Sequence, residues 1–128
     1  MMKKRRSTRA TAQLLAINAK LYEKERDRQI TRYRFSANTL RRLANRTAIR
    51  ESFLNELEEE LAELNLLLVR LPGEYAVVDL SKADSWVKLG FKRLKEANDD
   101  LLAASEEHIE MKYEQLYPAA NEEETGDD

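Results

Sequence analysis

The chain lacks cysteine altogether and has one histidine (His108), three glycines and two prolines among its 128 residues. The absence of cysteine excludes disulfides, thiolate metal sites and cysteine nucleophiles. One histidine is too few for a histidine dyad, and the Glu-rich surroundings of His108 lack the spacing of a metal site. Because Gly and Pro are scarce, the sequence predicts a mainly helical domain rather than a β-sandwich with many turns.

Long apolar runs are missing too. The run Leu66 to Val69 is four residues long, whereas a membrane-spanning helix needs about 20. We therefore expect a protein without membrane contact, in the cytoplasm, or in the nucleus of a eukaryote. No glycine-rich phosphate loop, nucleophile elbow or metal-ligand spacing occurs, so we expect no enzyme activity, no cofactor and no small-molecule substrate.

Charge is strongly segregated along the chain although its net value is only −2. Residues 1–50 contain 15 Lys or Arg against three Asp or Glu, and residues 51–63 contain six Glu and no base. Residues 96–128 contain twelve acidic residues and one Lys. This asymmetry is typical of a protein that meets a polyanion at one end.

Apolar periodicity predicts the order of elements. Leu14, Ile17 and Leu21, with Leu15 and Tyr22, form the apolar stripe of a first helix. The expected elements are a helix over 10–28, a strand over 30–35, helices over 37–46 and 50–65, and a hairpin of 66–71 and 75–80 around Pro72 and Gly73. Ser36 is expected to cap the second helix.

The segments before and after residues 10–80 are expected to lie outside the folded domain. Residues 1–9 are expected to form a disordered basic arm and 118–128 a disordered acidic tail. Residues 81–117 are expected to form a helical extension, with a long helical pattern from 91 to 117, that packs on the domain or makes a homodimer through residues 86–117. Trp86 and Phe91 are expected to be core or interface anchors.

The order helix, strand, helix, helix, hairpin resembles the winged helix-turn-helix class of DNA-binding domains over residues 10–80. The resemblance implies a mainly α fold with a small β-hairpin, namely a winged-helix-like three-helix core plus a C-terminal helix. It also implies a small non-enzymatic protein that binds double-stranded DNA, as a transcriptional regulator or a mobile-element accessory factor. A ribbon-helix-helix dimer, with residues 30–36 as the ribbon, is an alternative within the same class.

The candidate contacts to DNA are Arg, Lys, Asn and hydroxyl side chains in the basic half. Arg pairs bidentately with phosphate or guanine, and Asn pairs with adenine. The candidates are Lys3, Lys4, Arg5, Arg6, Arg32, Arg34, Asn38, Arg41, Arg42, Asn45, Arg46, Thr47, Arg50, Ser52 and Asn55, with Arg28 beside them. The competing interpretation is a solvated face whose arginines pair with the Glu-rich helix.

That Glu-rich helix also limits how DNA could bind. Its outward face carries Glu56, Glu59 and Glu63, which repel phosphates, so only its first turn is compatible with a groove. The helix and the acidic tail support an alternative function, a protein-interaction adaptor or inhibitor that mimics nucleic acid. A further basic cluster, Lys82 with Lys88, Lys92, Arg93 and Lys95, is expected either to make flanking phosphate contacts or to pair with the tail.

Overall fold

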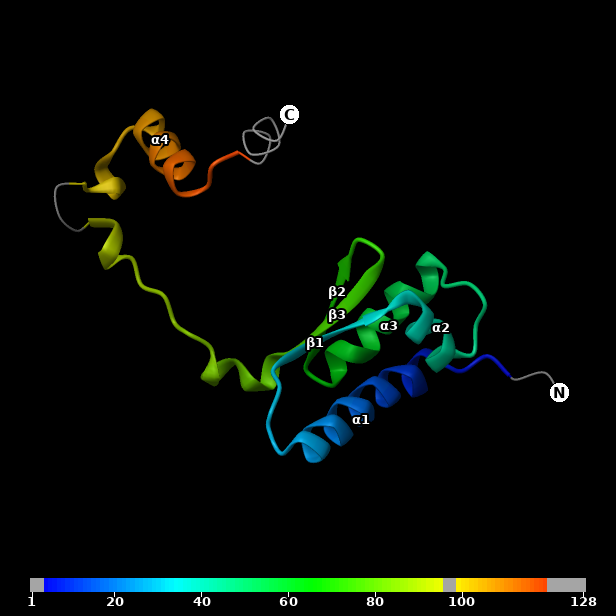
Figure 1. Ribbon diagram of the computed structural model, residues 1–128. Coiled ribbons are helices and arrows are strands. Elements are labelled where there is room, and N and C mark those ends of the chain that lie inside the picture. The colour runs from blue at the N-terminus through cyan, green and yellow to red at the C-terminus, as the bar shows by residue number, and fades with distance from the viewer. Residues whose placement is uncertain (1–3, 96–98, 120–128) are drawn as a thin grey trace, which may run out of the picture. The chain divides into compact units, whose positions relative to one another are not determined.

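The computed structural model describes residues 4–95 and 99–119. The chain divides into two compact units, Met1–Trp86 and Val87–Asp128, and each is described by itself. The helices and strands of the first unit are α1 (Thr8–Arg26), β1 (Arg32–Ser36), α2 (Ala37–Ala44), α3 (Glu51–Glu63), β2 (Leu66–Leu71) and β3 (Glu74–Asp79), followed by a 3-10 helix over Leu80–Ser85 (Figure 1).

The three strands form one antiparallel sheet in the order β1-β3-β2. The hairpin of β2 and β3 confirms the sequence prediction, and Gly73 at its turn has a φ of 75°, which favours glycine. β1 pairs with the other side of β3, from Arg32 opposite Val78 to Ser36 opposite Glu74. The fold is therefore α-rich with a small three-stranded sheet.

The helix ends follow from local chemistry. The hydroxyl of Ser36 accepts a hydrogen bond from the Thr39 amide at 3.1 Å, so the expected N-cap of α2 is confirmed. α2 ends at Asn45, which adopts a left-handed conformation with a φ of 53°. Its backbone amide donates hydrogen bonds to the Arg41 and Arg42 carbonyls. Asparagine tolerates this conformation better than most residues, and the sharp turn directs the chain toward α3.

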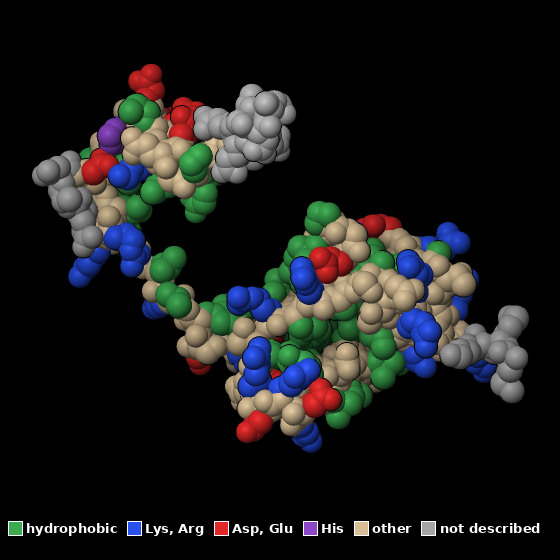
Figure 2. Space-filling model, in the orientation of Figure 1, with side chains coloured by type: hydrophobic (Ala, Val, Ile, Leu, Met, Phe, Trp, Pro, Cys, Tyr) green, Lys and Arg blue, Asp and Glu red, His purple; other side chains and the backbone are tan. Residues whose placement is uncertain are grey.

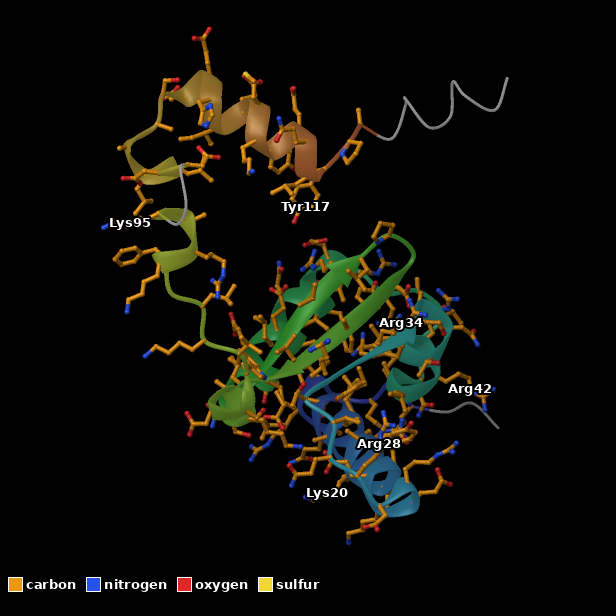
Figure 3. All side chains as sticks on the ribbon, turned by 60° about the vertical axis from the view of Figure 1, so that its left-hand side comes forward. Lys20, Arg28, Arg34, Arg42, Lys95 and Tyr117 are labelled. Atoms are coloured by element: carbon orange, nitrogen blue, oxygen red, sulfur yellow. The ribbon has the colours of Figure 1, made fainter. Side chains whose placement is uncertain are left out.

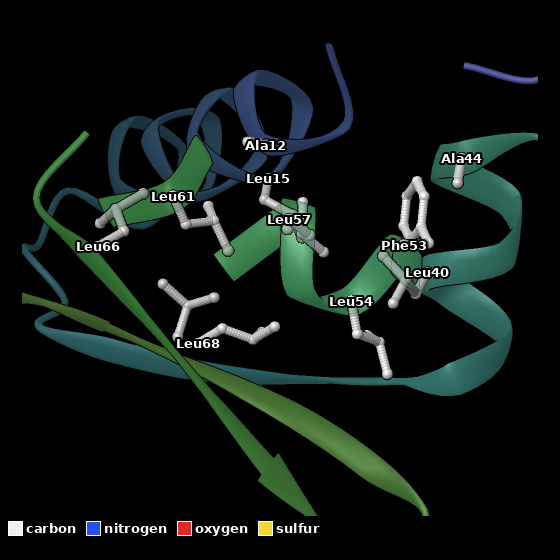
Figure 4. Packing of buried hydrophobic residues seen from close by; sticks show 11 residues of the cluster. Ala12, Leu15, Leu40, Ala44, Phe53, Leu54, Leu57, Leu61, Leu66 and Leu68 are labelled. Carbon is white, nitrogen blue, oxygen red and sulfur yellow. The ribbon is translucent and has the colours of Figure 1, made fainter. Parts of the chain in front are cut away.

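The core lies between the three helices and the sheet (Figure 4). Leu40 and Ala44 of α2, Leu57 and Leu61 of α3, and Val77 of β3 have no exposed surface. Burying a leucine side chain stabilises a fold by about 1.5–3 kcal/mol. Since α2, α3 and the sheet all contribute to this one cluster, the side chains on their outer surfaces stand on a rigid support.

The predicted stripe of α1 is largely wrong. The buried residues of α1 are Thr11, Ala12 and Leu15, whereas Ile17 and Leu21 are 51% and 58% exposed. The small side chains of Thr11 and Ala12 allow α1 to come close to its neighbours, and the Thr11 hydroxyl donates to the Ser7 carbonyl at 2.8 Å, which removes the cost of burying it. Periodicity of large apolar residues alone selected the wrong face.

The second unit contains less helix than the sequence predicted. Instead of one long helix over 91–117, the described residues form 3-10 turns at Lys92–Lys95 and Leu101–Ala103 and one α-helix, α4 (Glu106–Leu116). Ser105 caps the start of α4 by accepting from the His108 amide, and no residue of α4 is buried. Trp86 and Phe91 are exposed, so neither is a core anchor, and their alternative role as interface anchors stays a prediction.

None of the helices among the described residues is both long enough and apolar enough to cross a membrane.

Candidate nucleic-acid interface

Six of the candidate residues lie together at the end of the first unit that carries α2. Asn38, Arg41, Arg42, Asn45, Arg46 and Thr47, which we call the α2 surface, line an open hollow of about 580 Å³. Figure 2 shows Lys and Arg side chains gathered at this end, and Figure 3 shows Arg42 directed outward from α2. The left-handed turn at Asn45 returns the chain to this side, which explains why Arg46 and Thr47 join the residues of α2.

Arg46 is held in place rather than extended into solvent. Its guanidinium lies 4.3 Å from the centroid of the Phe53 ring, and one of its terminal nitrogens donates to the Arg6 carbonyl at 3.0 Å. An arginine stacked on an aromatic face gains a cation–π attraction. Arg46 therefore joins the N-terminal segment to α3 and positions the neighbouring side chains.

The N-terminal segment is attached at the C-terminal end of α2. The Arg6 amide donates to the Ala44 carbonyl at 2.9 Å, and the Arg6 guanidinium donates to the Leu43 carbonyl. A cation is favourable there because the last carbonyls of a helix carry partial negative charge. Arg6 is thus a structural cap, while the exposed Lys4 and Arg5 emerge beside the α2 surface.

The predicted arm over residues 1–9 is correspondingly shorter in the structure. Thr8 and Arg9 belong to α1, and Arg6 is bonded to α2. Lys3 lies outside the described residues, as do the tail carboxylates Glu122, Glu123, Glu124, Asp127 and Asp128.

The first turn of α3 is divided between exposed and bonded side chains. Arg50 and Ser52 are exposed. Asn55, a candidate for reading bases, instead accepts a hydrogen bond from Arg70 of β2 at 3.1 Å. Arg70 also pairs with Glu51 at 2.5 Å and with Glu58 at 3.4 Å, and the hydrogen bond to Glu51 raises the pKa of its guanidinium.

The rest of the outward face of α3 stays acidic. Glu56, Glu59 and Glu63 are exposed, and no Lys or Arg in the described part of the chain pairs with them. The candidate arginines do not neutralise this row. Of Arg28, Arg32, Arg34, Arg41, Arg42, Arg46 and Arg50, only Arg34 pairs with a described carboxylate, that of Glu74 at 3.5 Å.

A second basic group lies apart from the α2 surface, at the outer edge of β1. Arg28, Arg32 and Arg34 line a groove of about 470 Å³ between this edge and the C-terminal half of α1. We call it the β1-edge groove. Its apolar lining includes Leu21, Tyr22 and Ile30, which sequence reasoning did not connect with a site. The sequence contained one sign of this groove: α1 has more apolar residues than a single buried face can accommodate, so some of them had to line a surface.

Lys82 has a structural role that differs from the expected phosphate contact. Its ammonium donates to a Glu23 carboxylate oxygen at 2.6 Å and to the Ile30 carbonyl at 2.9 Å. The other cations of that cluster, Lys88, Lys92, Arg93 and Lys95, are exposed in the second unit. The hydrogen bond from Lys82 lowers the pKa of Glu23, and the Ile30 amide, which donates to the same carboxylate at 2.9 Å, lowers it further.

The side chain of His108 lies beside an acidic residue of the second unit. Its Nε2 lies 2.6 Å from an Asp99 carboxylate oxygen, and Lys112 approaches the same carboxylate at 3.8 Å. No cluster of three metal-binding side chains occurs within residues 4–95 and 99–119.

The surfaces of the first unit thus separate into cationic side chains on α2 and β1 and carboxylates on α3. No known family model matches the chain, and neither a curated protein nor a solved structure is detectably similar to it.

Proposed function

We propose that this chain is a small non-enzymatic DNA-binding protein with a winged-helix fold, which contacts double-stranded DNA through the α2 surface together with Lys4, Arg5 and Arg50. The observation that carries the proposal is the α2 surface itself. Its residues are Arg, Asn and Thr, no carboxylate lines the hollow, and a fully buried core lies beneath it. Side chains that donate hydrogen bonds from a rigid support suit phosphates and base edges.

The order of the elements supports the winged-helix interpretation. Three helices, a strand between the first two and a following hairpin are present, and the first strand joins the hairpin to form one sheet. The ribbon-helix-helix alternative has less support, because β1 pairs with β3 of its own chain over five residues. The partners of β1 in that alternative would come from a second copy.

The distribution of charge determines which part of the domain faces the phosphates. The exposed Glu56, Glu59 and Glu63 oppose deep insertion of α3 into a groove. Asn55 is engaged by Arg70. The contact therefore falls on α2, the turn after it and the first residue before α3, and the N-terminal residues Lys4 and Arg5 add phosphate contacts beside it.

The adaptor function remains the second candidate, favoured by one observation. The row of Glu56, Glu59 and Glu63 is exposed, without a cation of the described residues beside it. Such a row suits a basic protein partner.

The test is the salt dependence of binding to a fluorescent random duplex, measured by anisotropy with the full-length chain. Lys4, Arg5, Arg41, Arg42 and Arg50 pair with no described carboxylate. If all five contact phosphates, the slope of log K against log salt is about −4.5, so affinity falls about 500-fold between 50 and 200 mM salt.

Arg42→Gln removes one of these phosphate contacts, so it is expected to make the slope of log K against log salt less negative by about 0.9. Lys24→Gln is the matched control. It also removes one positive charge, but Lys24 lies near the C-terminal end of α1, about 25 Å along the helix from the N-terminal end, which is the end next to α2. The proposal fails if the chain does not bind at 50 mM salt, or if the two variants have equal effects.

A further inference from the structure

The β1-edge groove is not needed for the proposed DNA contact. It runs beside β1, which stands at one edge of the sheet because the strand order is β1-β3-β2. Figure 3 shows Arg34 on β1 and Arg28 near the end of α1, and neither residue lines the hollow of the α2 surface. Two features determine what this groove could bind: the unpaired backbone groups of β1 and the side chains that line the groove.

The outer edge of β1 presents unpaired backbone groups. The Asp79 amide donates to the Thr31 carbonyl at 2.8 Å, so Thr31 directs its backbone toward β3. Hydrogen-bonding positions alternate along an antiparallel strand, so Tyr33 and Phe35 face β3 as well, while Arg32 and Arg34 direct their N–H and C=O groups outward. Within residues 4–95 and 99–119, no group is hydrogen-bonded to these outward atoms.

The side chains around this edge combine an apolar floor with positive charge. Leu21 and Tyr22 of α1 are 58% and 38% exposed, and Ile30 lies next to them in the lining. Arg28, Arg32 and Arg34 supply three cations, of which Arg34 also lies 3.5 Å from the Glu74 carboxylate and keeps a largely exposed side chain. The one carboxylate in the lining, Glu25, has Arg26 beside it at 3.8 Å. The groove is therefore positively charged along an apolar surface.

The outward backbone groups of β1 favour a peptide over a nucleic acid as the occupant of the groove. An extended polypeptide offers donors and acceptors in alternation and satisfies both the N–H and the C=O groups of Arg32 and Arg34. A phosphate only accepts, so the outward carbonyls would repel it. A second copy of β1 is also disfavoured, because it would place arginines opposite arginines.

We propose that β1 binds an extended acidic segment of a partner protein by strand addition. The backbone of the segment pairs with Arg32 and Arg34, its apolar side chains cover Leu21 and Ile30, and its carboxylates meet the guanidiniums. Charged side chains on an edge strand prevent indiscriminate pairing, and here they restrict the added strand to one of opposite charge.

The test uses the full-length chain and a short synthetic peptide that alternates Glu and Val, with binding followed by titration calorimetry. Two variants at one position separate charge from backbone. Arg34→Gln and Arg34→Pro both remove the guanidinium, but only proline removes the outward N–H. Proline is tolerated at an edge strand whose N–H faces away from the ladder. Arg34→Pro is expected to bind the peptide about fivefold more weakly than Arg34→Gln.

A modified peptide keeps the test valid even if Arg34→Pro does not fold. Methylation of alternate backbone nitrogens in the Glu-Val peptide removes its donors without changing its charge, and it is expected to abolish binding to the unmodified protein. Equal affinities for the two Arg34 variants, or for the methylated and unmethylated peptides, would overturn strand addition. So would equal binding of a peptide that alternates Lys and Val.

DNA is the other occupant that the experiment must distinguish. If a short duplex displaces the Glu-Val peptide, and Arg34→Gln weakens DNA binding as much as Arg42→Gln does, the β1 edge belongs to the DNA surface and the proposal is wrong. If the chain binds no DNA but binds the acidic peptide through Arg34, the strand-addition proposal stands and the proposed DNA function fails.

Discussion

The pairing of Glu23 with Lys82 gives the most sharply defined stability prediction. Their side chains are only 11% and 23% exposed, and Lys82 also bonds the Ile30 carbonyl in the loop before β1. Lys82→Met retains most of the aliphatic length but removes both hydrogen bonds. A hydrogen bond to a charged group contributes about 1.5–3 kcal/mol, so we expect the free energy of unfolding to fall by about 2 kcal/mol at pH 7.

The pH dependence of this loss tests the mechanism. The bond from Lys82 holds the pKa of Glu23 below its ordinary value of 4.5, so folding favours the charged carboxylate. The stabilisation is fully present above the unfolded pKa and is lost as the pH falls through the lower folded pKa. The difference between wild type and Lys82→Met should therefore be largest at pH 7 and should shrink as the pH falls below 4.5, leaving the parts due to the Ile30 carbonyl and to Asp79, whose carboxylate lies 3.7 Å from the Lys82 ammonium.

Urea unfolding followed by circular dichroism, at several pH values between 7 and 3.5, measures this difference. Glu23→Gln is the matched control, because it removes the charge while its amide oxygen can still accept from the Ile30 amide. The double variant should be less destabilised than the sum of the two single variants, since the partners interact directly. A difference below about 0.5 kcal/mol, or one that does not change with pH, would refute the reasoning.

Two further predictions concern α3. Leu57→Ala, at a position with no exposed surface, should lower the free energy of unfolding by about 2–5 kcal/mol, measured by urea denaturation. The loss should clearly exceed that of Ala62→Gly on the exposed side of the same helix, and equal losses would contradict the packing of the core. Glu56→Lys with Glu59→Lys should strengthen duplex binding in the anisotropy assay, because it replaces repulsion of phosphates by attraction. Unchanged DNA affinity would mean that α3 lies far from the duplex.

Features with local causes were predictable from the sequence. The hydroxyl of Ser36 caps α2, Gly73 forms the hairpin turn, and the apolar spacing of Phe53, Leu57 and Leu61 defines α3. Each depends on residues within a few positions of one another, so a single sequence contains the whole signal.

The arrangement of the candidate site was less predictable, because it depends on partners far away in the chain. Arg6 and Arg46 had the same sequence signature as the exposed Arg42, yet both are hydrogen-bonded within the fold. Asn55 is held by Arg70 of β2, and Lys82 by Glu23 of α1. Residue type indicated a basic surface, but only tertiary structure separates the side chains that stabilise the fold from those that face outward.

The helical pattern over 91–117 failed for a related reason. Helical propensity without a buried face rarely sustains a long helix, since most helical stability in proteins comes from packing. Ile109 and Leu116 remain exposed, and the capping hydroxyl of Ser105 starts a new helix in the middle of the pattern.

The separation of cations on α2 from carboxylates on α3 has a consequence for how this molecule approaches a polyelectrolyte. A rigid body with opposite charges on different helices has a permanent electric dipole, and an external field exerts a torque on it. The field of a duplex would rotate the first unit so that the arginines lead and the glutamates trail before any contact forms. This alignment acts over about 10 Å at 0.1 M salt, so the fraction of productively oriented encounters should decrease as ionic strength rises.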